Sequence, residues 1–272
     1  MTHDAAGPAI HHTVTGDGPP LLLVAGTGYA GATWLPALVE RLAEERTVIT
    51  YDHRGTGATG GSTEGLSTRG LARDAVTLLD ALGIDRVAVV GHSMGGRVAQ
   101  WIALDAPDRV GDLVLAATGP GPMPGAPAPV TGVPPAAAAT MIELGYEGYM
   151  RRQQATTFFT DDAVAEGHPA VEWLAHAFWA SRPSLRDYLA HVVARQQHDT
   201  LGLLDGIAHR TLVLVGELDT HRGGTGSHLE QSRFLAQALP DATLRVLPGL
   251  RHGYFWEAPQ MSADAVLEWL GP

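Results

Sequence analysis

Short apolar runs alternate along the chain with longer segments in which apolar residues recur every three or four positions. The runs are rich in Leu, Val and Ile and predict strands that are buried on both faces. They lie at residues 21–25, 47–51, 87–90, 113–116 and 212–215, and a further strand is predicted at residues 244–247. Helical spacing predicts helices at residues 34–45, 66–82, 94–104 and 258–270. This alternation predicts an α/β fold, with a mostly parallel central sheet flanked by helices.

The alternation stops between residues 119 and 210. Seven prolines lie between Gly119 and Pro135, and proline removes the N–H group that regular structure needs, so we interpret this stretch as a linker. Residues 136–197 have a helical pattern and are rich in aromatic side chains: Tyr146, Tyr149, Phe158, Phe159, Trp173, Phe178 and Trp179. We therefore predict a core made of residues 1–118 and 211–272. A proline-rich linker and helical cap, residues 119–210, is inserted after a central strand.

Composition and charge exclude several classes of function. The 272 residues include 29 Asp and Glu against 18 basic residues, for a net charge of −11 at pH 7. Such a surface repels a phosphate backbone, so we expect no nucleic-acid partner. The absence of cysteine excludes disulfides, thiolate nucleophiles and zinc sites built on sulfur. A hydrophobic content of 45% is enough for a sizeable core.

Two uncharged stretches, residues 18–39 and 113–142, are long enough to be considered as membrane spans. Glycine and proline interrupt both of them, so we expect no membrane span. The N-terminal residues Met1-Thr2-His3-Asp4 show neither the basic nor the apolar region of a secretory signal. We therefore expect a cytoplasmic protein. No feature of the sequence indicates an oligomeric state.

The run Gly91-His92-Ser93-Met94-Gly95 is the strongest candidate for chemistry. It joins a buried strand to a helix, where a sharp turn lifts a serine hydroxyl clear of the sheet and small residues at both ends let neighbouring backbone approach. Ser93 is thus the predicted nucleophile. Oriented N–H groups at the start of the helix favour the negative charge that develops when a carbonyl is attacked. The alternative is an ordinary glycine-rich turn.

A serine hydroxyl needs a base to remove its proton and an acid to orient that base. Asp219 follows the strand at 212–215, and His252 follows the strand at 244–247. The chain order Ser, Asp, His is the order found in α/β-hydrolases. Glu217 is the alternative acid, but its position at the strand end suits a bond to local backbone or solvent. A surface loop histidine is the alternative interpretation of His252.

With these residues in place, the sequence resembles the α/β-hydrolase superfamily over nearly its whole length. Five motifs occur in the order of that family: residues 21–28, 51–57, 91–95, 212–219 and 249–259. The last of them contains Gly249, His252, Glu257 and Pro259. Residues 99–104 and 106–110 are similar to the enol-lactonase and small-esterase branch, and residues 51–56 are similar to polyketide methylesterases.

The resemblance implies an oxyanion hole made by the backbone N–H groups of Thr27 and Met94. It places a cap above the nucleophile, so we expect the substrate to contact residues of the oxyanion loop, the core and the cap. These are Gly26, Gly28, Tyr29, Trp34, Tyr146, Phe158, Trp173, Phe178, Trp179 and Tyr254. The family usually has His-Gly where this chain has Ala25-Gly26, which puts the loop geometry and the fitting acyl groups in doubt.

The leading hypothesis is a serine hydrolase that cleaves a small to medium, largely apolar ester or lactone through an acyl-enzyme. We expect no cofactor and no metal, because the spacing of Asp199, Asp219, His221 and His228 matches no recognised ligand pattern. Asp52 and Arg54 are interpreted as parts of a structural turn.

Two other functions stay open. One is a tailoring enzyme that uses the same pocket without hydrolysis, as a cyclase, lyase, acyltransferase or perhydrolase, because the pocket and not the triad chooses the acyl acceptor. The other is a ligand receptor with a vestigial triad, which would not react with a fluorophosphonate probe at Ser93.

Overall fold

A computed structural model describes residues 9–125, 131–220 and 226–272 of the chain. Its centre is a seven-stranded sheet in the order β1-β3-β2-β4-β5-β6-β7. The strands are β1 (His12–Thr15), β2 (Pro20–Val24), β3 (Thr47–Tyr51), β4 (Val87–His92), β5 (Val110–Ala116), β6 (Thr211–Gly216) and β7 (Ala242–Leu247). The edge strand β1 pairs antiparallel with β3, and the other pairs are parallel. The predicted α/β fold with a mostly parallel sheet is confirmed.

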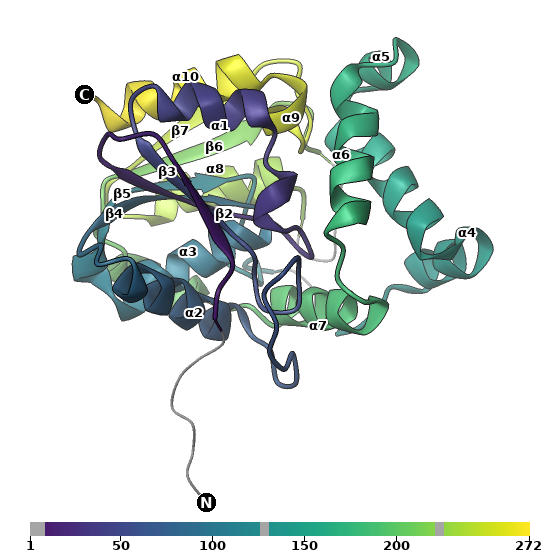
Figure 1. Cartoon of the computed structure of the whole chain (residues 1–272), viewed down its shortest axis with the longest axis horizontal. Helices are drawn as coiled ribbons and strands as arrows, with labels where there is room; N and C mark the ends of the chain where they lie inside the picture. Colours follow the sequence, from purple (N-terminus) through teal and green to yellow (C-terminus); the bar gives the residue numbers. More distant parts are fainter. Residues whose placement is uncertain (1–8, 126–130, 221–225) are drawn as a thin grey trace, which may run out of the picture.

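Helices cover both faces of the sheet (Figure 1). One buried apolar cluster joins the sheet to α1 (Pro36–Ala43), α9 (Tyr254–Glu257) and α10 (Pro259–Leu270). The other joins it to α2 (Thr68–Ala81), α3 (Met94–Asp105) and α8 (His228–Ala238). Short turns of 3₁₀-helix lie at Gly31–Thr33, Pro107–Arg109 and Leu201–Gly206. Each predicted core helix is present, with ends that differ by at most two residues.

Helix α8 is an element that the hydrophobic pattern did not predict. It begins with a capping box, in which Ser227 and Glu230 satisfy each other's backbone N–H groups. The spacing Ser-x-x-Glu is visible in the sequence, so a local signal for this helix was available.

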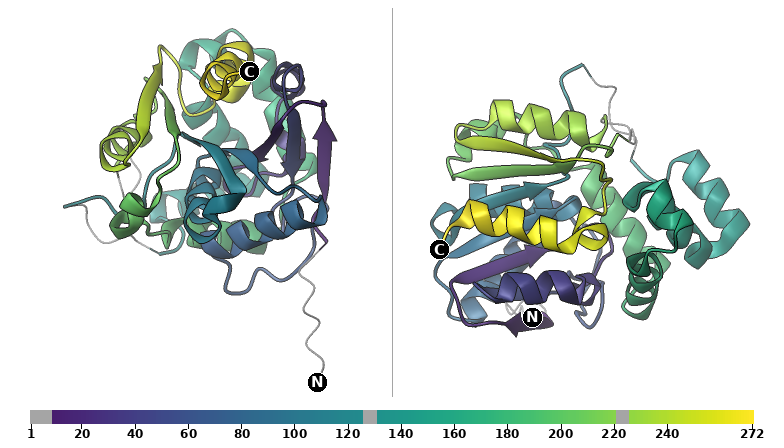
Figure 2. Two further views of the ribbon diagram at one scale, coloured as in Figure 1. Left: turned by 90° about the vertical axis from the view of Figure 1, so that its left-hand side faces the viewer. Right: turned by 90° about the horizontal axis from the view of Figure 1, so that it is seen from above.

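The chain between β5 and β6, residues 117–210, is called the inserted segment below. It contains α4 (Pro135–Gln153), a π-helix (Gln154–Phe158), α5 (Asp161–Ala165), α6 (Pro169–Ala180) and α7 (Leu185–Gln196). Figures 1 and 2 show α4, α5 and α6 standing beside the sheet layers rather than within them. A positive φ of 69° at Gly145 kinks α4. Among the described residues, no helix is long and apolar enough to cross a membrane.

Candidate active site

Ser93 occupies a strained turn between β4 and α3. Its φ of 57° and ψ of −118° are rare for a residue with a side chain, and such strain persists only where the surroundings hold it. Two hydrogen bonds do so. The Ser93 N–H donates to Ala116 O over 2.8 Å, and the Thr118 hydroxyl donates to Ser93 O over 2.7 Å. The end of β5 and the residues that follow it therefore fix the turn.

The glycines around Ser93 are required by close backbone contacts. A Cβ on Gly91 would lie 2.4 Å from Gly95 O, and a Cβ on Gly95 would lie 2.0 Å from Val24 O. A Cβ on Gly26 would lie 3.5 Å from the Ser93 Cβ, so the loop after β2 packs directly against the serine. This packing is the geometry that the sequence motif predicted.

Asp219 and His252 form a buried pair beside this turn. The His252 Nδ1–H group donates to Asp219 Oδ2 over 2.7 Å, and their side chains are only 4% and 1% exposed. His92, which precedes the serine, donates from Nε2 to His252 O over 2.9 Å. Burial holds the pKa of His92 well below its ordinary value, so the ring stays neutral and keeps its donor role.

The hydrogen bond between Ser93 and His252 is not formed in this structure. Among the described residues, the Ser93 hydroxyl has no hydrogen-bond partner. Catalytic hydrogen bonds are often long before a substrate is bound, so the arrangement still suits a nucleophile and its base. Glu217, the alternative acid, is exposed and accepts a bond from Gly249 N over 2.9 Å.

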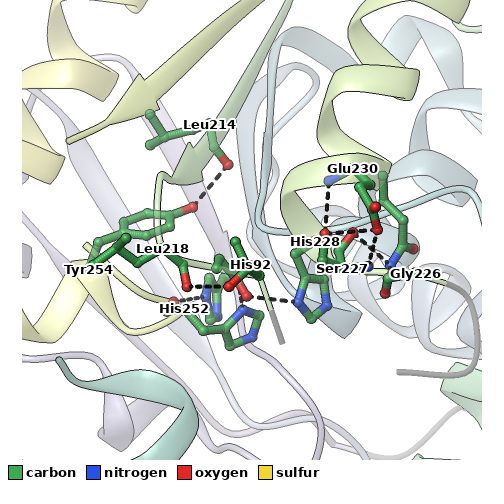
Figure 3. A network of polar contacts seen from close by, with 12 residues as sticks. His92, Leu214, Leu218, Gly226, Ser227, His228, Glu230, His252 and Tyr254 are labelled. Atoms are coloured by element: carbon green, nitrogen blue, oxygen red, sulfur yellow. Dashed lines mark hydrogen bonds and ion pairs between the residues drawn. The ribbon is translucent and has the colours of Figure 1, made fainter. Parts of the chain in front are cut away.

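A second imidazole contacts the same carboxylate. The His228 Nδ1–H group donates to Asp219 Oδ1 over 3.2 Å, and the His228 and His252 ring centroids lie 4.4 Å apart. Figure 3 shows the two rings converging on one network. Burial by itself raises the pKa of Asp219, but the two imidazoles outweigh it and bring that pKa below its usual range. Burial lowers the pKa of His228.

The two backbone N–H groups predicted to form an oxyanion hole are not used in other hydrogen bonds among the described residues. Within the described part of the chain, neither Thr27 N nor Met94 N donates a hydrogen bond, and Met94 is the first residue of α3, where N–H groups lack helical partners. His53 Nε2 donates to Ala25 O over 3.0 Å. This bond holds the loop that lacks the family's usual histidine.

Three of the predicted substrate-binding aromatics come together next to His252. The Phe158 ring lies 5.1 Å from the His252 ring and 5.5 Å from the Tyr29 ring. Phe178 lies 5.0 Å from Tyr29. Trp256, which the sequence analysis did not single out, completes the group at 5.6 Å from Phe158. The loop after β2, the π-helix, α6 and α9 supply these side chains, so only the fold brings them together.

The other predicted aromatics of the inserted segment, Tyr146, Trp173 and Trp179, contact side chains other than His252. Tyr146 contacts Trp179 and Tyr188 at 5.7 and 5.5 Å between ring centroids, and Arg182 lies 4.0 Å above the Trp179 ring. Trp173 is half-buried and packs against the main apolar cluster. Sequence reasoning missed Tyr188, whose ring would be 2.7 Å from a Cβ on Gly28.

Trp34 and Tyr254 have the contacts of core residues. Trp34 stacks on Trp256 with 5.6 Å between centroids and 3° between planes. Tyr254 is fully buried, and its hydroxyl donates to Leu214 O over 3.1 Å. Both residues therefore pack in the core, although the sequence predicted them as substrate-binding residues.

The residues considered as metal ligands are only partly brought together. Asp219, His228 and His252 each offer one ligand atom, and these atoms lie within 4.8 Å of one another. Asp199 instead accepts a bond from Leu201 N over 3.0 Å, and His221 lies outside the described residues. The structure thus groups His252 with Asp219 and His228, two of the residues whose sequence spacing matches no recognised ligand pattern.

Known proteins share this architecture. The family model for the α/β hydrolase fold matches residues 19–259. A protein of Variovorax paradoxus named carbamate hydrolase RutD is 32% identical over 248 residues, which are 90% of each chain. A thermophilic esterase from Thermogutta terrifontis is 25% identical, with a TM-score of 0.81 over 99% of this chain and 95% of that one. Est816, an N-acyl homoserine lactone degrading enzyme, is 25% identical with a TM-score of 0.77 over 97% of each chain.

The match to the family model covers most of the chain, including the serine turn and the histidine loop. The relatives named above support a hydrolase, and the resemblance to the superfamily is confirmed. The chain belongs to the α/β-hydrolase fold family.

Proposed function

We propose that the protein is a serine hydrolase that cleaves a carboxylic ester or a lactone through an acyl-enzyme. The observation that carries the proposal is the buried Asp219–His252 pair beside the strained turn of Ser93. Because Asp219 holds the Nδ1–H group of His252, the Nε2 atom keeps a free electron pair. That atom can accept the proton of a hydroxyl.

Each step of the reaction has a group to perform it. His252 Nε2 takes the Ser93 proton while Ser93 Oγ attacks the acyl carbon, and the N–H groups of Thr27 and Met94 bind the oxyanion. The C–O bond to the leaving alcohol breaks as His252 returns the proton to it. A water molecule, deprotonated by His252, then attacks the acyl carbon. The bond from that carbon to Ser93 Oγ breaks, His252 returns the proton to Oγ, and the acid is released.

The surroundings of the pair favour an uncharged, largely apolar acyl group. Tyr29, Phe158, Phe178 and Trp256 form an aromatic wall beside His252. We assign residues 119–210 to a cap over this wall and the other residues to the core. The esterase and the lactone-degrading enzyme with similar folds support esters and lactones as substrates, and the name of the Variovorax relative adds carbamates to the compounds to test.

The test is hydrolysis of a panel of p-nitrophenyl esters, lactones and carbamates by the wild type and by Ser93→Ala. Loss of a triad nucleophile typically lowers kcat by about 10⁶-fold, so we expect no measurable turnover by the variant and an unchanged circular dichroism spectrum. A fluorophosphonate should label the wild type at Ser93 alone. Activity of the variant within tenfold of wild type would refute the assignment.

The same experiment separates the rival functions. A receptor with a vestigial triad would neither react with the probe nor release acid from any compound. A cyclase, lyase, acyltransferase or perhydrolase would react with the probe, but mass spectrometry would show a product other than the free acid.

A further inference from the structure

The carboxylate of Asp219 lies between two imidazoles, although a triad needs only one. Its two oxygens face different rings, with 2.7 Å from Oδ2 to His252 Nδ1 and 3.2 Å from Oδ1 to His228 Nδ1. The rings themselves are 4.4 Å apart and inclined by 30°. Three groups that commonly bind metal ions are therefore gathered at one point, and one of them is the proposed catalytic base.

We propose that Asp219, His228 and His252 form a binding site for a zinc-like divalent ion, and that an ion bound there switches the hydrolase off. The switch rests on the proposed function, whereas the binding site does not. The proposal departs from the expectation drawn from sequence spacing, because His252 lies 33 residues from Asp219 and only the fold brings it to the other two residues.

The donor set and its dimensions suit zinc. Zn²⁺ binds imidazole nitrogen and carboxylate oxygen at about 2.0 to 2.2 Å, so that ligand atoms around a tetrahedral ion are roughly 3.4 Å apart. The 3.2 Å between His228 Nδ1 and Asp219 Oδ1 is close to this value. The 2.7 Å contact of His252 has to lengthen, and the ligand atoms, all within 4.8 Å of one another, have to draw together.

His228 provides the route by which an ion reaches the site. The side chains of Asp219 and His252 are 1% and 4% exposed, whereas that of His228 is 26% exposed. Backbone contacts keep His228 in place, because the next residue, Leu229, donates its N–H to Asp219 O over 3.1 Å. The positive end of the α8 dipole disfavours a cation near His228. The negative carboxylate of Asp219 is closer to the site and offsets this repulsion.

Metal binding at Nδ1 would stop the chemistry through the tautomer of His252. The ion takes the place of the Nδ1 proton, which leaves to solvent, and the neutral ring takes up a proton at Nε2. The charge of the ring is unchanged, but Nε2–H is now a donor and cannot accept the proton of Ser93. The enzyme would regain activity when a chelator removes the ion.

Direct binding of zinc is measured on the Ser93→Ala variant, so the result does not depend on enzyme activity. Zinc chloride titrated into this protein in a calorimeter should bind at one site per chain. The additional substitution His228→Phe keeps an aromatic ring, and His228→Gln keeps an N–H donor for Asp219. Both should weaken binding at least tenfold. The matched control His176→Gln, which removes an exposed histidine of α6, should leave the affinity unchanged.

Inhibition is tested on the active protein. Zinc should suppress ester hydrolysis by the wild type, EDTA should restore it, and the His228→Phe and His228→Gln variants should need at least tenfold more zinc for half inhibition. The use of two variants guards against misfolding of one. Equal zinc affinity with and without His228, or no binding at all, overturns the site, and binding without inhibition overturns the switch. A wild type that hydrolyses no ester even without zinc would refute the proposed function but leave the binding result intact.

Discussion

At the scale of single residues, Ser93, Asp219 and His252 could be predicted from the sequence because each is marked by its immediate neighbours along the chain. Ser93 is identified by the glycines that the turn requires, since a Cβ at Gly91 or Gly95 would collide with backbone. Asp219 was preferred to Glu217 because of its position past the strand, and the structure places Glu217 on the backbone N–H of Gly249. His228 was not predicted next to His252, because their 4.4 Å separation depends on the packing of α8.

Asp219→Asn should lower kcat/KM by about 10⁴-fold, the loss seen when the acid of a triad becomes an amide. The amide can donate to His252 Nδ1, so the ring carries its proton on Nε2 and cannot act as a base. Glu217→Gln is the matched control and should retain nearly full activity, because Glu217 is exposed. Steady-state kinetics with one ester measure both. If Glu217→Gln were the more damaging change, the assignment of the acid would be wrong.

At the scale of elements, strands were easier to predict than contacts between elements. Strands β2 to β6 are largely continuous apolar runs because both faces are buried, so they could be predicted from the pattern, and β7 at the sheet edge was predicted from residues 244–247. Helix α8 was missed because its mixed pattern lacks a clear apolar stripe, although its capping box is local. The helical nature of the inserted segment was visible in the sequence. The sequence did not show which aromatics of this segment lie near His252, because the contact that brings Phe158 there is long-range. In that contact Gly253 N donates to Phe158 O over 2.8 Å.

Phe158 is the predicted aromatic that contacts His252, so it is the first side chain to test for selection between long-chain and short-chain esters. Phe158 lies 5.1 Å from the His252 ring, so Phe158→Ala should change the preference for a long-chain over a short-chain ester by about 10- to 200-fold, the scale of discrimination in apolar pockets. Trp179→Ala is the control, because that ring contacts Tyr146 and Arg182 instead. The ratio of kcat/KM for the two esters is measured within each variant, so that a partly unfolded sample does not affect it.

Two outcomes would count against a selective role of Phe158. One is an equal change for both esters, which would mean that the ring only supports the position of His252. The other is an equal shift of the ratio in the Trp179 variant. Selectivity would then belong to the inserted segment as a whole, and Tyr146, Trp173 and Phe178 would be replaced singly by Ala in the same assay.

At the scale of the whole molecule, buried histidines join the core to the inserted segment. His53 follows β3 and His191 lies on α7, with 6.0 Å between their ring centroids. His53 donates to Ala25 O in the oxyanion loop, and His191 donates to Arg54 O over 2.8 Å. Burial lowers the pKa of both rings, so these bonds are made by neutral imidazoles. Acid should therefore weaken the boundary between the two parts of the chain.

The stability of the protein should fall as the pH drops below about 6.5, the ordinary histidine pKa. Burial, with a smaller contribution from His191, lowers the pKa of His53 from 6.5 to about 3. The unfolded chain therefore binds a proton in this window that the native state does not, so stability is complete above pH 6.5 and is lost as the pH falls toward 3. His53→Gln keeps an N–H donor for Ala25 O but does not titrate. Urea unfolding at pH 7, 6, 5 and 4 should show up to a tenfold smaller change in the unfolding equilibrium per pH unit for the variant than for the wild type. If the stability of the two proteins falls equally with pH, His53 takes up its proton without unfolding. The interpretation of His53 as a neutral buried ring would then be wrong.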